Sequence, residues 1–413
     1  MKLDCIDELA QSAEARWREV NYSEDAFPDI ATKVFEEVGA HRRLTTSRVL
    51  QAVLAPWASP RSQIRHPSSG IVTLYTGTRF QILGHLWVDS VGSAHQHGWV
   101  GAYQMVDGSS LSAHFEFEEH HRLRSEIRLG QLRTTHLSYL RSGDIVPVHA
   151  GHRLIHSLSH VERPSLSISL RSVDRTASTL DYARPGICYP MGSMERDIED
   201  RLRCLDVLLQ TDEAAWEEAL GTLVQEHNIV TTFYALRQAS LNRRLIPERV
   251  LEMARRQHGP LFDYMERSLG SFLLTSKIEG LRRTIQDHDL RFFLGVLYLA
   301  ENRGEVLQLF ALRHGDEDPT RWLGSCLAKL LIDTGDGDAG DGDSGDGDDD
   351  DMEMPEGVVE GLGRLAMGQS LDAILPDLAK VADPEDVEDE ADFLREAIGA
   401  LEEAVMYRPL FAG

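Results

Sequence analysis

The spacing of hydrophobic residues changes twice along the chain. Up to about residue 56, apolar side chains recur every three or four positions, which is the period of a helix with one buried face. From about 70 to 172 the period shortens to two, in short runs separated by turn residues, and it is strictest from Ser165 to Leu170. After about 190 the helical period returns and persists. The pattern predicts N-terminal helices, a β-rich middle and a long helical remainder.

The β-rich part contains roughly eight runs at short intervals, which indicates an antiparallel sandwich or barrel. The predicted fold class is therefore α+β with several domains. The predicted parts are an N-terminal helical extension (1–59), a β-barrel (60–185), a helical domain (190–332), a linker (333–355) and C-terminal helices (356–413).

The predicted linker is rich in aspartate and glycine. Residues 333–351 hold ten Asp and six Gly and no basic residue. This composition cannot bury enough apolar surface to offset the entropy of ordering, so we predict a disordered segment. An EF-hand calcium loop is excluded, because no register supplies its glycine, its final glutamate and its flanking helices together.

Composition excludes several classes of protein. Of the 413 residues, 42% are hydrophobic, enough for a sizeable core. The formal net charge of −25 repels phosphate backbones and anionic membrane surfaces, so nucleic acid is not an expected partner. The four scattered cysteines suit a reducing compartment, and we see neither a signal peptide nor a stretch of 18 apolar residues. These features predict a cytoplasmic protein without a membrane span.

Candidate chemistry concentrates in the β-rich part, where 11 of the 17 histidines lie between His85 and His160. The sharpest element is the run Gly92 to Gly98, which contains His95 and His97. Side chains two positions apart on a strand face the same side, so this pair can offer two imidazoles to one metal ion.

A second group of histidines follows about 55 residues later. His152, His156 and His160 share strand parity, so all three face one side if this segment is extended. Any one of them would complete a three-histidine site with open positions for a substrate or dioxygen. Trp99 and Tyr103 are candidates to line a substrate cavity, and Gln104 is a candidate to contact a ligand on the metal.

These motifs resemble a known family. An HxH pair, a turn ending in glycine at Asp107-Gly108, then Gly143-Asp144 and a downstream histidine are similar to the cupin superfamily, whose small jelly-roll barrels hold a metal among inward histidines. Trp87, the run GSAHQHG, the N-terminal helices and the run SHVERPSLSISLRS look most like the cysteine dioxygenase-type thiol dioxygenases. The resemblance covers about residues 60–175.

The resemblance implies specific roles. His95, His97 and His156 would bind Fe(II), with His152 and His160 as rivals for the third place. The enzyme would insert dioxygen into a thiol or amino-acid-like substrate. An arginine upstream of the HxH pair would bind the substrate carboxylate, and both Arg65 and Arg79 fit that description.

The sequence also departs from this family. Many cupins have a glutamate ligand shortly after the HxH pair, where this chain has Val100, Gly101 and Ala102. No cysteine lies between Cys5 and Cys188, so the cysteine that some relatives crosslink to tyrosine has no counterpart. Ser169 and Arg171 replace a His-Tyr pair.

We therefore carry three hypotheses. The first is a cytosolic non-haem Fe(II) oxygenase that acts on a small molecule. The second is a non-oxidative cupin enzyme, an isomerase or lyase, with another divalent metal. The third is a ligand-binding or regulatory module whose helical domain signals to a protein partner.

Overall fold

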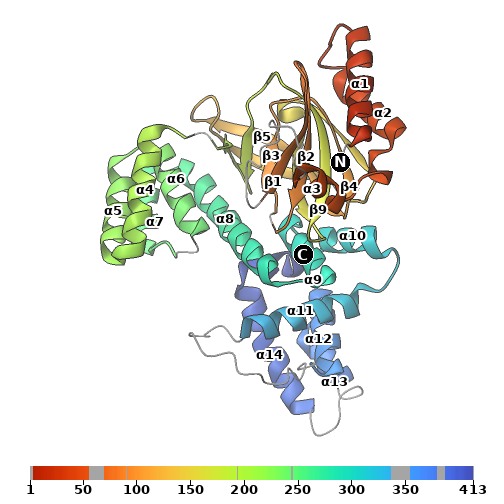
Figure 1. Cartoon of the computed structure of the whole chain (residues 1–413). Coiled ribbons are helices and arrows are strands. Elements are labelled where there is room, and N and C mark those ends of the chain that lie inside the picture. The colour runs from red at the N-terminus through yellow and green to blue at the C-terminus, as the bar shows by residue number, and fades with distance from the viewer. Residues whose placement is uncertain are drawn as a thin grey trace. The chain divides into compact units, whose positions relative to one another are not determined.

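The computed structural model describes residues 3–54, 69–89, 91–192, 194–242, 245–335, 354–378 and 387–412. By its internal contacts the chain divides into two compact units, residues 1–284 and 285–413 (Figure 1). The first unit contains every described strand, and each unit is described by itself below. The domain boundaries expected from the sequence remain predictions.

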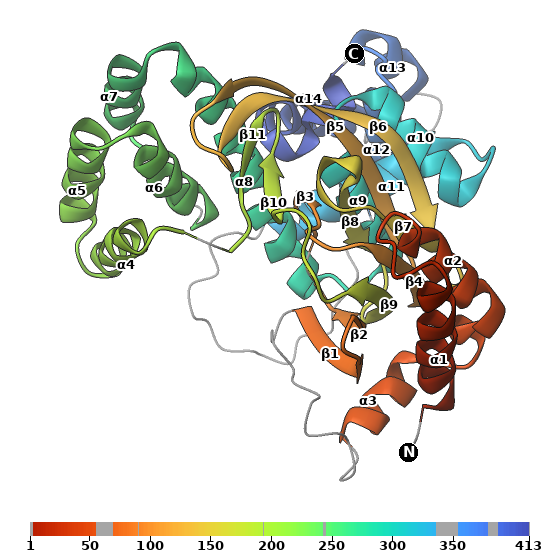
Figure 2. The same ribbon diagram turned by 90° about the horizontal axis from the view of Figure 1, so that it is seen from above.

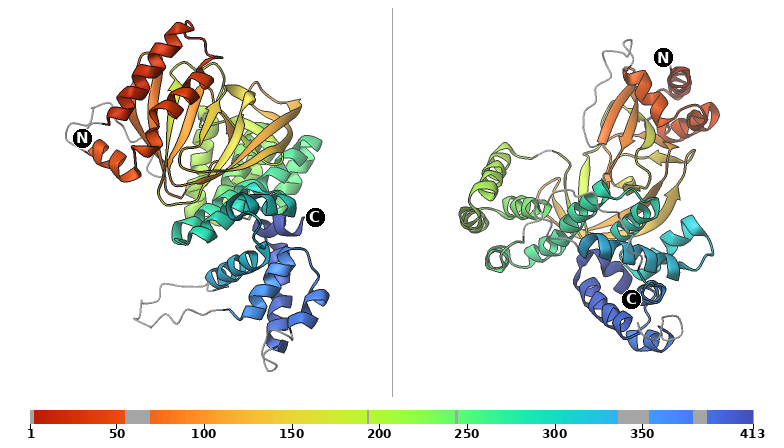
Figure 3. Two further views of the ribbon diagram at one scale, coloured as in Figure 1. Left: turned by 90° about the vertical axis from the view of Figure 1, so that its right-hand side faces the viewer. Right: turned by 60° about the horizontal axis from the view of Figure 1, so that its bottom comes forward.

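The chain begins with α1 (Asp4–Glu19), α2 (Phe27–Val38), a 3-10 turn η1 (Ala40–Arg42) and α3 (Thr46–Leu54). The apolar side of α1 and α2 packs on one sheet of the barrel, where Leu9 and Phe35 join Ile82, Leu166 and Leu170 in one buried cluster. Figure 3 shows these helices lying along one face of the barrel. The N-terminal helices predicted from the three- and four-residue spacing are confirmed.

The sheet under these helices has five strands. In order across the sheet they are β1 (Ser69–Thr76), β2 (Phe80–Trp87), β9 (Ser165–Ser172), β4 (Gly101–Asp107) and β7 (Ile145–Val148). The even-numbered leucines and isoleucine of β9 face the N-terminal helices, while Ser167 and Ser169 bond to Trp87 and His85 on the other side. The alternation of apolar and polar residues over 165–170 therefore corresponds to the two faces of β9.

The other strands form a closed ring that the second view shows from above (Figure 2). In order they are β10 (Leu180–Ala183), β11 (Ile187–Pro190), β6 (Arg128–Leu140), β5 (Ser110–Arg122), β8 (Ile155–His160) and β3 (Ala94–Gln96). All recorded pairings in both sheets are antiparallel. The predicted antiparallel β-barrel, with helices before and after it, is confirmed.

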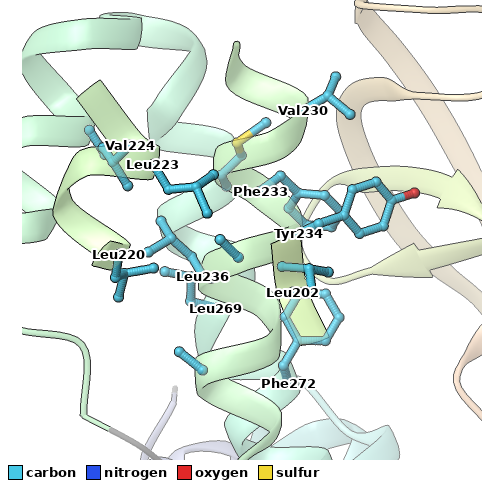
Figure 4. Close-up of a cluster of buried hydrophobic side chains, with 14 of the residues drawn as sticks. Leu202, Leu220, Leu223, Val224, Val230, Phe233, Tyr234, Leu236, Leu269 and Phe272 are labelled. Carbon is cyan, nitrogen blue, oxygen red and sulfur yellow. The ribbon is translucent and has the colours of Figure 1, made fainter. Parts of the chain in front are cut away.

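Five helices complete the first unit: α4 (Arg196–Thr211), α5 (Glu213–Glu226), α6 (Ile229–Leu241), α7 (Glu248–His258) and α8 (Pro260–Thr284). The carboxylate of Asp212 accepts a hydrogen bond from the Ala215 amide and so caps α5. Figure 4 shows the apolar cluster that joins α4, α5, α6 and α8. Phe233 and Tyr234 of α6 also touch Tyr189 of β11, so this cluster continues onto the barrel.

The second unit is helical throughout its described part. It consists of α9 (His288–Leu299), α10 (Arg303–His314), α11 (Pro319–Gly335), α12 (Glu356–Ala366), α13 (Leu371–Leu378), α14 (Val387–Glu403), a 3-10 turn η3 (Val405–Tyr407) and α15 (Arg408–Phe411). Every residue from Leu290 to Leu299 is buried, so α9 is the central helix of this unit.

Most of the predicted Asp/Gly linker, residues 336–353, lies outside the described residues, and α11 extends to Gly335. No described helix is both long and apolar enough to cross a lipid bilayer.

Candidate metal centre

Two histidines of the site are fixed by strand pairing. β3 lies beside β8, and the register places His95 directly opposite His156. Directly opposed residues of an antiparallel pair point to the same face of the sheet, and the two ring centres are 4.6 Å apart. Two short antiparallel strands therefore hold both imidazoles in place.

His97 joins this pair from the residue just after β3. Its ring centre lies 4.6 Å from that of His95 and 5.0 Å from that of His156. The Nε2 atoms of His97 and His156 are 2.9 Å apart, and one ring nitrogen of each histidine lies within 4.8 Å of the others. Two nitrogens bound to one ion at about 2.1 Å would be roughly 3 to 3.4 Å apart, so the three rings need only small shifts to share a metal ion.

The electrostatics favour neutral imidazoles. Burial, and then the neighbouring imidazoles, hold the pKa of both His97 and His156 well below the usual value of a histidine. A neutral imidazole has a lone pair to offer to a metal, whereas a protonated one has none. Each of these two rings is therefore neutral at neutral pH and has one unprotonated nitrogen that can bind a cation.

The groups behind the ligands also suit a metal. The Nδ1 of His95 donates to the carbonyl of Ser93 at 2.7 Å, which leaves its Nε2 as the coordinating atom. The Nδ1 of His156 is buried and has no hydrogen-bond partner among the described residues. The donor set thus fits a three-histidine metal site, although one ligand lacks the second hydrogen bond that usually orients a metal-bound histidine.

The two rival histidines lie elsewhere. His152 is exposed on a 3-10 turn, η2 (Gly151–Arg153), so the condition that the whole segment from His152 to His160 is extended is not met. His160 is on β8 with the parity of His156, but it is four residues further along the strand. Its Nδ1 pairs with the hydroxyls of Ser110 at 2.6 Å and Ser165 at 3.1 Å, and its ring stacks on Trp87.

The expected substrate-binding residues divide into two groups. Trp99 and Tyr103 are buried beside the cluster, with ring centres 4.6 Å from His97 and 5.8 Å from His156 respectively. Arg79 instead lies exposed over the ring of Tyr22, away from the histidines.

Gln104 lies on the opposite face of its strand from Tyr103. Its Nε2 donates to the carbonyl of Gly143 at 3.1 Å and to the Nδ1 of His41 at 3.2 Å, toward the N-terminal helices. The structure thus does not bring it to the three histidines. The other candidate, Arg65, lies outside the described residues.

Two charged residues that the sequence reasoning did not select lie close to the cluster. Asp181 on β10 is directly opposite His95, and it accepts a hydrogen bond from the Ser93 hydroxyl at 2.8 Å. Burial raises the pKa of Asp181, although the neighbouring His95 opposes that shift. Arg171 on β9 shares the parity of Ser169, and its charge further lowers the pKa of His97 and of His85. Strand parity could have revealed Arg171, whereas Asp181 required the register of a distant strand.

Three buried or half-buried histidines, His85, His97 and His156, make the metal-free protein sensitive to acid. Burial lowers the pKa of His85 to about 4 and shifts His97 and His156 in the same direction. In the unfolded chain these groups titrate near about 6.5, so below that pH the unfolded state binds more protons and becomes favoured. We expect the melting temperature of chelator-treated protein to be flat above about pH 7 and to fall steadily from pH 6.5 toward pH 4. A melting temperature that rises over that interval would show that these rings are not buried in their neutral form.

No protein-family model and no curated protein matches the chain. Among solved structures, similar chains include one from a study of two DMSP lyases (15% identity, covering 41% of this chain and 92% of that chain, TM-score 0.23). Others are an oxalate oxidase (13%, 43% and 84%, TM-score 0.21) and the vicilin from Solanum melongena (12%, 29% and 31%, TM-score 0.20). The described residues themselves show a closed antiparallel β-barrel with a cluster of three histidines that could hold a metal ion.

Proposed function

We propose that this chain is a metal-dependent enzyme, a non-haem Fe(II) oxygenase that acts on a small molecule. The observation that carries the proposal is the convergence of His95, His97 and His156, each of which has a ring nitrogen within 4.8 Å of the others. Three neutral, buried or half-buried imidazoles whose ring nitrogens converge on one position offer their lone pairs to a cation there.

The donor set favours a transition metal. Three imidazoles without a carboxylate in the group suit iron, zinc, copper or nickel better than magnesium or calcium. The sequence resemblance to three-histidine thiol dioxygenases favours Fe(II) among these. A bound ferrous ion would supply the redox chemistry that activates dioxygen, which no side chain of the cluster can supply.

The surrounding residues favour a substrate with an acidic group. Arg171 projects from the sheet on the other side of the barrel, near enough for its charge to act on His97. A guanidinium binds a carboxylate with two parallel hydrogen bonds, so Arg171 takes the role that the resemblance assigned to Arg65 or Arg79. Trp99 and Tyr103 would exclude water and orient the substrate beside the histidines. A thiol or amino-acid-like substrate agrees with this arrangement.

Oxygen uptake with a screen of small thiols tests the proposal. We expect iron-reconstituted wild-type protein to consume oxygen with at least one thiol that carries a carboxylate, and to be inactive with the matching thiol that lacks it. Turnover under anaerobic conditions would instead favour the isomerase or lyase. Absence of turnover with every candidate, together with tight ligand binding, would favour the binding module.

A further inference from the structure

A row of histidines continues past the metal cluster onto two further strands. Within the cluster, His95 on β3 is paired with His156 on β8. His156 is in turn paired with His114 on β5, and His114 with His136 on β6. The four strands are neighbours in the order β3, β8, β5 and β6 (Figure 2). Directly opposed residues of antiparallel strands point to the same face, so the four imidazoles share the face that carries the cluster.

The last two histidines of this row lie close to each other. The ring centres of His114 and His136 are 5.6 Å apart, and the two ring planes are inclined at 62°. The ring centres within the metal cluster are separated by 4.6 to 5.0 Å, so a small movement of one ring gives the second pair the same spacing. His114 is not one of the histidines whose ring nitrogens converge in the cluster. The two histidines therefore form a pair of their own.

Neither imidazole of the pair is committed to another group of the protein. Within the described part of the chain, His114 and His136 take part in no hydrogen bond and no ion pair. By contrast, the Nδ1 of His160, on the same face, is bonded to the Ser110 hydroxyl. Burial, and then the charge of His136, lower the pKa of His114, so that ring is neutral at neutral pH. The pair therefore has ring nitrogens available to bind a metal ion.

The pair is open to solvent on one side and held by the sheet on the other. His136 is exposed, and His114 is half-buried. A β-bulge lies directly beside them, because Phe115 is paired with Thr134 and Thr135 is an extra residue of β6. Bulges of this kind re-aim side chains and are frequent next to functional sites. An ion from solution can reach the exposed ring directly, while the strand pairing keeps the second ring beside it.

We propose that His114 and His136 form a second transition-metal site, separate from the three-histidine cluster. Two imidazoles suit nickel, copper or zinc, which accept nitrogen ligands readily, and water would complete the coordination of the ion. With two protein ligands instead of three, this site is weaker than the cluster. It is therefore empty when a chelator competes for the metal, and it fills when the free ion is added. This binding does not depend on whether the chain is an oxygenase.

Calorimetric titration of the full chain with Ni²⁺ tests the second site. We expect wild-type protein to bind one ion tightly at the cluster and another more weakly at the pair. His136→Ala should weaken the second event by more than about tenfold, because it removes one of two ligands, and His114→Gln should do the same. The tight event should be unchanged in both variants. A single binding event in wild type, or an unchanged weak event in either variant, would overturn the inference.

His121→Ala is the matched control for these variants. His121 lies on β5 like His114 and is exposed like His136, but it is paired with Leu129 and not with a histidine. We expect both Ni²⁺ binding events of this variant to equal those of wild type. An equal loss of the weak event in His121→Ala and His136→Ala would show that the ion binds to scattered surface histidines, and the proposed pair would be wrong.

The same titration in His97→Ala separates this inference from the proposed function. A weak event that survives in His97→Ala while the tight event is lost supports two independent sites. Loss of both events in His97→Ala would show that the pair is not a site of its own. If wild-type protein has no tight event but its weak event depends on His136, the metal cluster fails and the second site stands. If the tight event is present and the weak one does not depend on His136, the second site alone fails.

Discussion

Replacing His156 by alanine should abolish metal binding by the purified protein. The Nε2 of His156 lies 2.9 Å from the Nε2 of His97. The substitution therefore removes one of the three ligands of the site. Loss of a group that merely orients a ligand costs about 10- to 100-fold in metal affinity, so loss of the ligand itself should cost more than about 100-fold. Elemental analysis and titration against a chromophoric chelator measure the change.

Two other histidine variants serve as controls for His156→Ala. His152→Ala should bind metal as wild type does, because this side chain is exposed on the turn before β8. His160→Ala should retain metal binding but lose stability, because it removes hydrogen bonds to Ser110 and Ser165 inside the barrel. Normal metal content in His156→Ala, or loss of metal in His160→Ala, would show that His156 is not the third ligand.

Replacing Arg282 by methionine should lower the free energy of unfolding by about 3 kcal/mol, because two buried carbonyl groups lose the charged donor that satisfies them. Arg282 is fully buried at the end of α8 and donates to the carbonyls of Asp89 and His160. These carbonyls follow β2 and end β8, so the same change should loosen the strand that carries His156. Urea unfolding and the chelator titration measure the two effects.

Arg283→Met is the matched control for this variant. Arg283 is the next residue of the same helix, and its side chain is exposed. A surface substitution of this kind changes stability by no more than about 0.5 kcal/mol. Equal effects of the two substitutions would show that the buried hydrogen bonds of Arg282 do not hold the helix on the barrel.

Local sequence patterns were sufficient for the barrel and for most of the cluster. The alternation from Ser165 to Leu170 depends only on the period of a strand, and the structure has a strand there. His95 and His97 come together because they are two residues apart, a relation that the sequence displays directly. The family resemblance favours His156 over its rivals His152 and His160, and His156 is the one that lies in the cluster.

Other residues could not be placed without the pairing of distant strands. Gln104 is next to Tyr103 in sequence, yet the two lie on opposite faces of β4, and only the packing of the N-terminal helices decides which face is outside. His152 lies on a turn because the chain enters β8 only at Ile155. Local periodicity carries no information on either point.

The charged residue opposite His95 was the hardest to predict. Asp181 reaches His95 through a strand pairing across more than 80 residues. It belongs to no motif and lies among residues with ordinary strand periodicity. Its position beside the cluster follows from the register of distant strands alone.

The most direct test of the metal site is a crystal structure of the iron-reconstituted protein, with anomalous diffraction data collected at the iron absorption edge. We predict one strong anomalous peak at about 2.0 to 2.2 Å from a ring nitrogen of each of His95, His97 and His156. A peak bound by other residues, or no peak at these histidines in protein that contains stoichiometric iron, would contradict the central claim.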